Sequence, residues 1–204
     1  MPNADPSKPT ALTLQREIAR KGFHLLSVAV PIAYALGVGR TIVVLGLTFA
    51  LAVALVVEVA RARHERTRSV FDARLGRLLR VHETTGLSGA TWLVIALLAA
   101  ALLFPRDIAI AAMAAVAVGD AAAAIVGRAL THHGGEGKSV AGSLACFAAS
   151  ASMALAIARF TWPEALIAGI LAAIAERPRR PLDDNLRIAF AVGCGILLWR
   201  MRFS

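Results

Sequence analysis

Residues 41–60 form a run of twenty nearly uniformly apolar residues. A helix of this length rises about 1.5 Å per residue and covers the roughly 30 Å hydrocarbon core of a bilayer. Six further apolar runs predict about seven transmembrane helices in all, of which the first and the last two are short enough to require tilting or a thinned bilayer. These six runs cover residues 23–38, 87–104, 108–126, 140–158, 164–175 and 188–199.

The composition supports this class of fold. Hydrophobic residues make up 58% of the chain and the mean hydropathy is +0.68, far above the values of ordinary globular domains. Residues 61–83 differ, because apolar side chains recur there at helical spacing between arginines, and they predict an amphipathic helix at the cytoplasmic membrane surface. We expect an all-α, polytopic integral membrane protein with a disordered tip at 1–15 and one membrane-embedded domain at 16–204.

The basic residues are distributed unevenly between the two faces that seven helices would create. With a cytoplasmic N-terminus, 17 of the 22 lie on the cytoplasmic side, and 5 lie on the other: Arg40, Arg106, Arg159, Arg200 and Arg202. This bias follows the positive-inside rule and predicts an inner-membrane protein of a bacterial cell with its N-terminus and polar face in the cytoplasm. The net charge of +9 is therefore assigned to helix orientation and to anionic lipids, and not to nucleic acid.

Asp120 is a carboxylate inside an otherwise Ala-rich apolar segment. A charge at membrane depth costs roughly 2.5–3.5 kcal/mol on insertion scales, so it persists where a partner ion or a polar cavity receives it. Gly119, Ala123 and Gly127 form a ladder of small residues at i, i+4 and i+8, which lets a neighbouring helix approach Asp120 closely. Asp120 is therefore a candidate functional residue, and a buried pair with an arginine is the alternative.

The polar loop before the run 140–158 has the chemistry of a phosphate site. Its sequence GGEGKS ends at Ser139; the glycines allow backbone amides to approach a phosphate, and Lys138 adds a positive charge where the next helix starts. The last letters imitate a Walker A motif, but His132 replaces the first glycine and a membrane helix replaces the strand. A P-loop fold is therefore excluded, and a flexible loop is the alternative for the glycines.

Two more polar clusters are predicted on the cytoplasmic face. Arg16, Arg20 and His24 are spaced i, i+4 and i+8, with Lys21 on an adjoining helical face, although a plain positive-inside anchor would also account for the basic residues. Residues 183–185, Asp-Asp-Asn, follow a loop that two prolines stiffen. They offer the hard oxygen ligands that suit Mg²⁺, or they cap the last helix.

Five short segments lie in order on this predicted face: RKGFH (20–24), SGATW (88–92), GDAAAAIVGR (119–128), GKSVAGSLA (137–145) and DDNL (183–186). In order and spacing they resemble the polyprenol kinase family of membrane enzymes, which includes dolichol kinase, phytol kinase and the CTP-dependent diacylglycerol kinase. The resemblance covers most of the chain. It implies a lipid kinase that transfers the γ-phosphate of CTP to a lipid alcohol, either an isoprenoid alcohol or diacylglycerol, taken from the cytoplasmic leaflet.

The resemblance also implies roles for single residues in the membrane-embedded domain, which would be catalytic. The implied catalytic residues are Asp120, His24 and Asp183, and a carboxylate or His24 would accept the alcohol proton. Basic, hydroxyl and glycine residues would bind the nucleotide, while acidic residues and an amide would bind Mg²⁺ or Mn²⁺. The nucleotide set is Arg20, Lys21, Gly137, Lys138, Ser139, Gly142 and Ser143. The metal set is Asp120, Asp183, Asp184, Asn185 and Glu176.

The chain departs from the family pattern at one position. Ala141 stands where the family usually has Glu, between the Lys-Ser pair and the next glycine, so the acid that completes the metal site would be Glu176 or Glu136. Other functions stay open: a CTP-dependent lipid cytidylyltransferase, which would release pyrophosphate, and a non-catalytic membrane protein that retains the fold. A transporter is disfavoured, because the polar residues collect at one end of the helices and not across the midplane.

Overall fold

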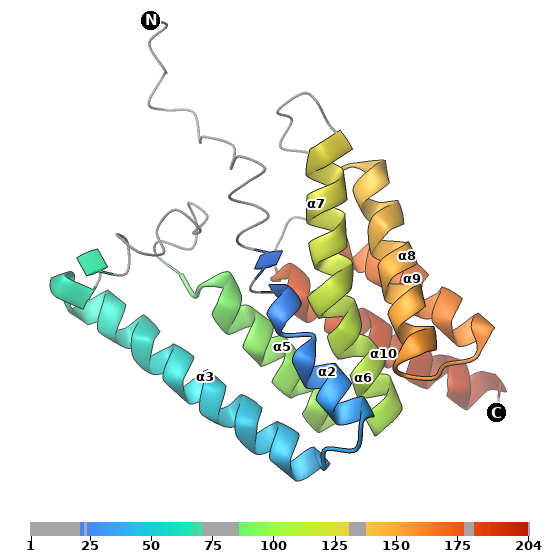
Figure 1. The fold of residues 1–204 in the computed structure, drawn as a ribbon, viewed down its shortest axis with the longest axis horizontal. Coiled ribbons are helices and arrows are strands. Elements are labelled where there is room, and N and C mark those ends of the chain that lie inside the picture. Colours follow the sequence, from blue (N-terminus) through green and yellow to red (C-terminus); the bar gives the residue numbers. More distant parts are fainter. Residues whose placement is uncertain are drawn as a thin grey trace, which may run out of the picture.

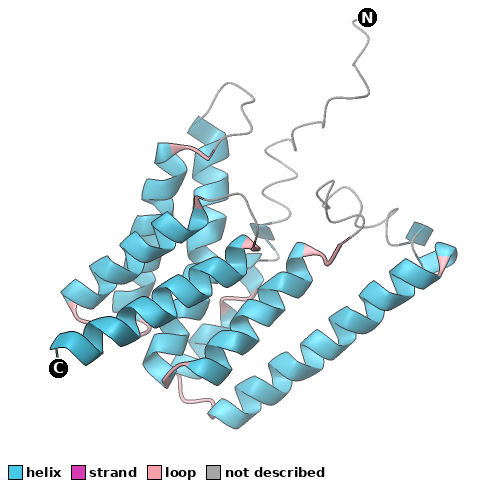
Figure 2. Cartoon of the chain, turned by 180° about the vertical axis from the view of Figure 1, so that it is seen from behind, coloured by secondary structure: helices cyan, strands magenta, loops and turns pink. Residues whose placement is uncertain are grey.

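The computed structural model describes residues 21–22, 24–67, 69–70, 86–130, 138–177 and 182–203, and every regular element within these ranges is a helix (Figures 1 and 2). This confirms the all-α prediction. The predicted tip 1–15, most of the predicted amphipathic helix, and Arg16, Arg20, Glu136 and Gly137 lie outside these ranges. The elements are α2 (Ala29–Ala35), α3 (Arg40–Arg63), α5 (Gly89–Leu103), α6 (Arg106–Ala114), a π-helical turn η3 (Ala115–Gly119), α7 (Asp120–Leu130), α8 (Val140–Ala156), α9 (Trp162–Glu176) and α10 (Asp184–Phe203).

The segments α6, η3 and α7 follow one another without a break and count as one rod, so the described helices form seven rods. Successive rods alternate in direction (Figure 1). Each rod overlaps one of the seven apolar runs that the sequence contains. Two of them, Arg40–Arg63 with 24 residues and Arg106–Leu130 with 25, are long and apolar enough to cross a membrane by length and composition. We call the end of the bundle near Asp120 the site end, and the opposite end, near Arg106, the far end.

The rod made of α6, η3 and α7 is the centre of the bundle. Its α6 and η3 segments contact α2, α5, α8, α9 and α10, and its most apolar stretch is 78% buried. Alanines along it, such as Ala109, Ala112 and Ala117, are fully buried. Because these side chains are small, several helices can pack around one rod at short range. Asp120 follows the π-helical turn of this rod directly.

The small-residue ladder of α7 brings α8 into close contact, as the sequence predicts. A Cβ atom built on Gly142 of α8 would lie 2.7 Å from the Ala123 carbonyl oxygen and 3.3 Å from the Gly127 Cα atom. Only glycine fits at this crossing without a shift of backbone. The crossing fixes the start of α8, where the Ser139 hydroxyl accepts a hydrogen bond from the Gly142 amide at 3.0 Å.

Arginines close helix ends at the far end. Arg40 donates to the Leu102 carbonyl oxygen at 2.5 Å, near the end of α5, and Arg106 donates to the Tyr34 carbonyl oxygen at 2.5 Å, near the end of α2. Arg200 of α10 donates to Glu164 at 2.6 Å and to Asp107 at 2.5 Å, which joins α10 to α9 and α6. Cations near helix C-termini are stabilised by the carbonyls and the helix dipole. These contacts give a packing role to three of the five basic residues that the sequence analysis assigns to this end.

Replacement of Gly142 tests the α7–α8 crossing. We expect Gly142→Ala to lower the free energy of unfolding by about 1–3 kcal/mol, because its methyl group would overlap a backbone carbonyl. In Gly46→Ala, the matched control inside α3, the new Cβ meets nothing within 4 Å. This change should be neutral or stabilise by up to about 1 kcal/mol, since glycine is a poor helix former. Thermal unfolding in detergent measures both, and equal midpoints would show that the crossing is not close.

Candidate functional site

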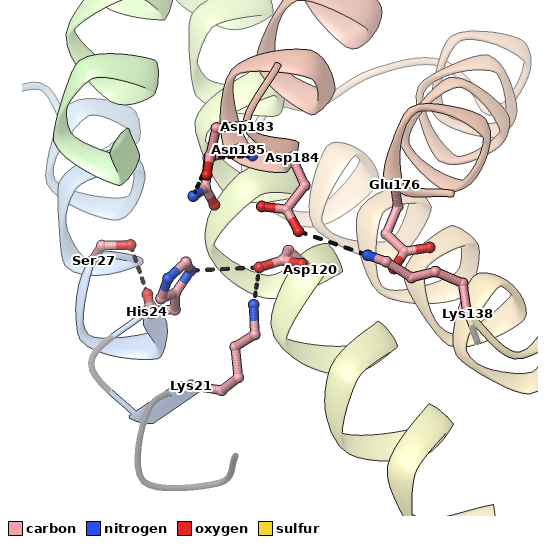
Figure 3. Close-up of polar contacts among 9 residues, drawn as sticks. All are labelled: Lys21, His24, Ser27, Asp120, Lys138, Glu176, Asp183, Asp184 and Asn185. Carbon is pink, nitrogen blue, oxygen red and sulfur yellow. Dashed lines mark hydrogen bonds and ion pairs between the residues drawn. The ribbon is translucent and has the colours of Figure 1, made fainter. Parts of the chain in front are cut away.

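Polar side chains gather at the site end, where α7, α8, α9 and α10 meet the residues just before α2 (Figure 3). They come from five separate short segments of the chain, and most of them are buried. The cluster contains most of the candidate residues that the sequence singles out within the described ranges. Its members are Lys21, His24, Asp120, Lys138, Glu176, Asp183, Asp184 and Asn185.

Asp120 is the centre of one half of this cluster. Asp120 is 2% exposed, and its carboxylate accepts a hydrogen bond from the ammonium group of Lys21, a residue that is 1% exposed. The Nδ1 atom of His24 lies 3.6 Å from the same carboxylate oxygen. Two cation-forming side chains from one short segment therefore face the carboxylate of the central rod. The ion that pairs with Asp120 is a lysine, and not the arginine considered from the sequence.

Lys138 is the centre of the other half. Its ammonium group donates to Glu176 at the end of α9, and it lies 3.6 Å from the Asp184 carboxylate at the start of α10. Glu176 is 3% exposed, whereas the Lys138 side chain is 28% exposed. Asp184 lies between the two lysine-centred halves (Figure 3). One lysine thus ties together the ends of three helices.

Asp183 and Asn185 form a local turn at the start of α10. The Asp183 Oδ1 atom accepts hydrogen bonds from the Asn185 amide at 3.0 Å and from its side-chain Nδ2 at 2.8 Å. Burial, with the neighbouring charge of Asp184, raises the pKa of Asp183 to about 6. The ionised form of Asp183 is therefore disfavoured, and a cation between the two neighbouring carboxylates would favour it. The hydrogen bond from the Asn185 amide to Asp183 caps α10, so the helix-cap role that the sequence left open is observed for Asp183.

The acidic set suits a hard cation by its chemistry. Carboxylate and amide oxygens are the preferred ligands of Mg²⁺, and the Asn185 Oδ1 atom is a buried acceptor without a hydrogen-bond partner in the described part of the chain. The same part contains no group of three or more His, Cys, Asp and Glu side chains placed to hold a metal ion. Asp120 and Glu176 bind lysines instead. A cation that used the lysine-bonded oxygen of either carboxylate would therefore compete with that lysine.

The hydroxyl groups of the predicted nucleotide set serve the helix in this structure. The Ser139 side chain caps α8 through the Gly142 amide, and the Ser143 hydroxyl donates to the Ser139 carbonyl oxygen at 3.4 Å. Gly142 has a packing role against Gly127 and Ala123. Ser139, Gly142 and Ser143 lie at the start of α8, directly after Lys138 in the sequence. Arg20 and Gly137 of this set lie outside the described residues.

Sequence reasoning missed Glu58, which organises the SGATW segment. Its carboxylate accepts hydrogen bonds from the Ser88 amide at 2.8 Å, the Thr91 hydroxyl at 3.0 Å and Arg61 at 2.6 Å. Arg61 also donates to the Gly86 carbonyl oxygen at 2.8 Å. The signal was present, because Glu58 is an acid inside an apolar run, as Asp120 is. Glu58 fixes the start of α5 on α3 and lies outside the lysine-centred cluster.

Comparisons with known proteins add little to this geometry. No family model matches the chain, and no solved structure matches it. An uncharacterized protein of Rickettsia prowazekii is 28% identical over 134 residues, which are 64% of this chain and 65% of that protein. The chain therefore matches just under two thirds of that relative's length, and the match shows no family. The resemblance to the polyprenol kinases stays a prediction.

The Lys21–Asp120 pair makes a prediction about stability. Asp120→Asn leaves a buried ammonium group without its counter-ion, so we expect the free energy of unfolding to fall by about 3–5 kcal/mol. The double change Lys21→Met with Asp120→Asn removes both charges and should recover most of that loss. Chemical unfolding of the two single variants and the double variant gives the coupling energy. Additive losses would show that the two charges do not stabilise one another.

Proposed function

We propose that this protein is a membrane-embedded lipid kinase, which transfers the terminal phosphate of a nucleoside triphosphate to the hydroxyl group of a lipid alcohol. The observation that carries the proposal is the pairing of two lysines with buried carboxylates in one cluster at the end of an apolar helical bundle. Phosphoryl transfer needs positioned cations and acids more than covalent chemistry. CTP as the donor, and an isoprenoid alcohol or diacylglycerol as the acceptor, follow from the family resemblance.

The membrane setting is supported by the surface of the rods. Only 17% of the most apolar stretch of α3 is buried. Large apolar side chains on it are exposed, such as Phe49 by 72% and Val56 by 68%. Exposed apolar surface of this extent marks a contact with lipid or with another protein. We propose that all seven rods cross the bilayer, with the site end in the cytoplasm as the distribution of basic residues predicts.

Lys138 and Lys21 would be the groups that receive the phosphates. Each now neutralises a carboxylate, so a bound triphosphate would compete with that carboxylate for the ammonium group. Asp183, Asp184 and Asn185, joined by Asp120 once Lys21 has moved, would hold Mg²⁺ or Mn²⁺. That ion would neutralise charge on the phosphate oxygens. Lysine suits this exchange, since its compact ammonium group carries three donors on a flexible stem.

The reaction itself requires one proton acceptor. The alcohol oxygen forms a bond to the γ-phosphorus while the bond to the bridging oxygen breaks, and the nucleoside diphosphate leaves with that oxygen. The hydroxyl proton passes to an imidazole or carboxylate within reach. His24, whose Nδ1 atom lies 3.6 Å from Asp120, is the candidate, because the carboxylates of Asp120, Asp183 and Asp184 would hold the ion.

Labelled CTP tests the proposal directly. Purified protein in lipid nanodiscs, supplied with Mg²⁺ and a panel of polyprenol, phytol and diacylglycerol, should transfer label from the γ position to one of these lipids. Excess EDTA should abolish the transfer. Label that reaches the lipid only from the α position would instead establish a cytidylyltransferase. Absence of transfer from either position, with CTP or ATP, would favour a non-catalytic protein.

Lys138 should be needed for turnover. We expect Lys138→Met to slow phosphate transfer at least about a hundredfold, some 2.7 kcal/mol of transition-state stabilisation, because a phosphate would lose its cation. Combining it with Glu176→Gln avoids a stranded carboxylate and keeps the protein folded while it stays inactive. Arg202→Gln, an exposed change at the far end, is the control and should leave the rate unchanged. Full activity of a folded double variant would remove Lys138 from the site.

The lysine pairs also predict how ligands bind. The lysines and carboxylates of the cluster now bind each other, so a cation alone or a triphosphate alone has to break an ion pair in order to bind. When both ligands are present, the triphosphate binds the lysines and frees the carboxylates for the cation, and the cation binds the carboxylates and frees the lysines for the triphosphate. Isothermal titration with Mn²⁺ and a non-hydrolysable CTP analogue should therefore show each ligand tightening the other at least about tenfold, and by the same factor in both orders. Independent binding of the two would contradict this exchange.

A further inference from the structure

Arg187 is a cation at the site end to which no sequence motif and no step of the proposed reaction assigns a role. It lies on the first turn of α10, and its Nε atom donates a hydrogen bond to the Ala175 carbonyl oxygen at 3.1 Å, at the end of α9. The next residue of α9 is Glu176, which binds Lys138. Asp184, on the same turn of α10 as Arg187, is the other acid near Lys138. Arg187 therefore lies at the edge of the lysine-centred cluster.

One edge of the Arg187 guanidinium group is bonded, and another is not. The Nη1 atom is buried and has no hydrogen-bond partner in the part of the chain that the structure describes. Arg200, on the same helix, uses both its Nε and its Nη1 atoms, which donate to Glu164 and Asp107. A buried donor on a charged group is costly when it is left unpaired. The Nη1 atom of Arg187 is therefore available to an acceptor from outside the described residues.

The acceptor that fits this donor is an anionic oxygen. A guanidinium group carries only donors, which excludes a metal ion as the partner. The neighbouring carboxylates are engaged, since Glu176 binds Lys138 and Asp184 lies 3.6 Å from the same ammonium group. Phosphate oxygens match the planar fork of arginine, and hydrogen bonds between charged groups are shorter and stronger than neutral ones. The bond to Ala175 also fixes the guanidinium group before a ligand arrives, so less freedom is lost on binding.

We infer that Arg187 is a phosphate-binding residue of the site, and that its Nη1 atom donates to a phosphate whose charge Lys138 also balances. The inference rests on the proposed function for the kind of ligand. It gives the two cations different parts, because Lys138 has to leave Glu176 before it binds a phosphate, whereas Arg187 stays on the end of α9 and binds with its second edge. The phosphate is carried by the donor nucleotide or by the phosphorylated lipid, since both present the same oxygens.

Two substitutions at Arg187 test this role. Arg187→Gln removes the charge, and Arg187→Lys keeps the charge but replaces the fork by one ammonium group. Arg177→Gln is the matched control, because Arg177 is exposed and lies at the same end of α9. The purified proteins in lipid nanodiscs are titrated with a non-hydrolysable CTP analogue in the presence of Mn²⁺. We expect both changes at Arg187 to weaken binding at least about tenfold, and the change at Arg177 to leave it within about twofold.

A purely structural role of Arg187 gives a different result. If Arg187 only closes the end of α9, its replacements lower the thermal midpoint of the free protein but leave the affinity of the folded protein for the analogue unchanged. Both quantities are measured on the same samples. Arg187→Lys retains a donor for the Ala175 carbonyl oxygen, so the test stays possible if Arg187→Gln does not fold. An unchanged affinity removes Arg187 from the nucleotide.

A second probe identifies the source of the phosphate. Phosphatidate, added to the protein in detergent micelles, carries a lipid phosphate without a nucleotide, and its binding is followed by the rise in thermal midpoint. Loss of this rise in the Arg187 variants assigns Arg187 to the phosphorylated lipid, and loss of nucleotide affinity assigns it to the donor. A wild-type protein that binds neither the analogue nor phosphatidate overturns the inference and the proposed function together. Binding in the wild type that the Arg187 variants fully retain, with both probes, overturns the inference alone.

Discussion

The buried ion pair between Lys21 and Asp120 is the interaction on which the site end depends. A carboxylate in the centre of an apolar bundle is tolerated because an ammonium group neutralises it, and either charge alone would cost several kcal/mol. The pair ties the residues just before α2 to the central rod, at the point where the π-helical turn ends. Single π-helical turns are frequent at functional sites. Here the turn immediately precedes the acid that the other groups surround.

Small residues are what allow the second ion pair to stand beside the first. The contact of Gly127 with Gly142 brings α8 against α7, and this places Lys138, two residues before the helix, within reach of Glu176 and Asp184. A larger residue at the crossing would move Lys138 away from the acids. Packing and electrostatics are therefore linked, because the positions without side chains determine where the charges lie.

Much of this arrangement can be predicted from the sequence, because its signals are local. The apolar runs fix the helices, and an acid in an Ala-rich helix with glycines at i, i+4 and i+8 identifies both Asp120 and its close packing. The partners of the charges could not be predicted, since they depend on which helix ends meet in space. Lys21 was assigned to phosphate and Asp120 to metal, yet the two bind each other. The role of Glu58 could not be predicted either, because its partners Ser88 and Thr91 lie about 30 residues further along the chain.

The choice between lysine and arginine separates charges that hold the fold from charges that would act. The helix ends are closed by arginines, Arg40, Arg106 and Arg200 at the far end and Arg61 on α3, each of which donates to a backbone carbonyl or to carboxylates. In the cluster at the site end, the cations that bind the buried carboxylates are Lys21 and Lys138. A guanidinium group forms a rigid, planar fork that suits permanent contacts, whereas an ammonium group is a point charge that exchanges one oxygen for another. The proposed site, which would release its carboxylates to a cation and accept phosphates in their place, is served by the second kind. The distribution of the two side chains is thus an argument for an exchanging site at this end of the bundle, independent of the resemblance to any family.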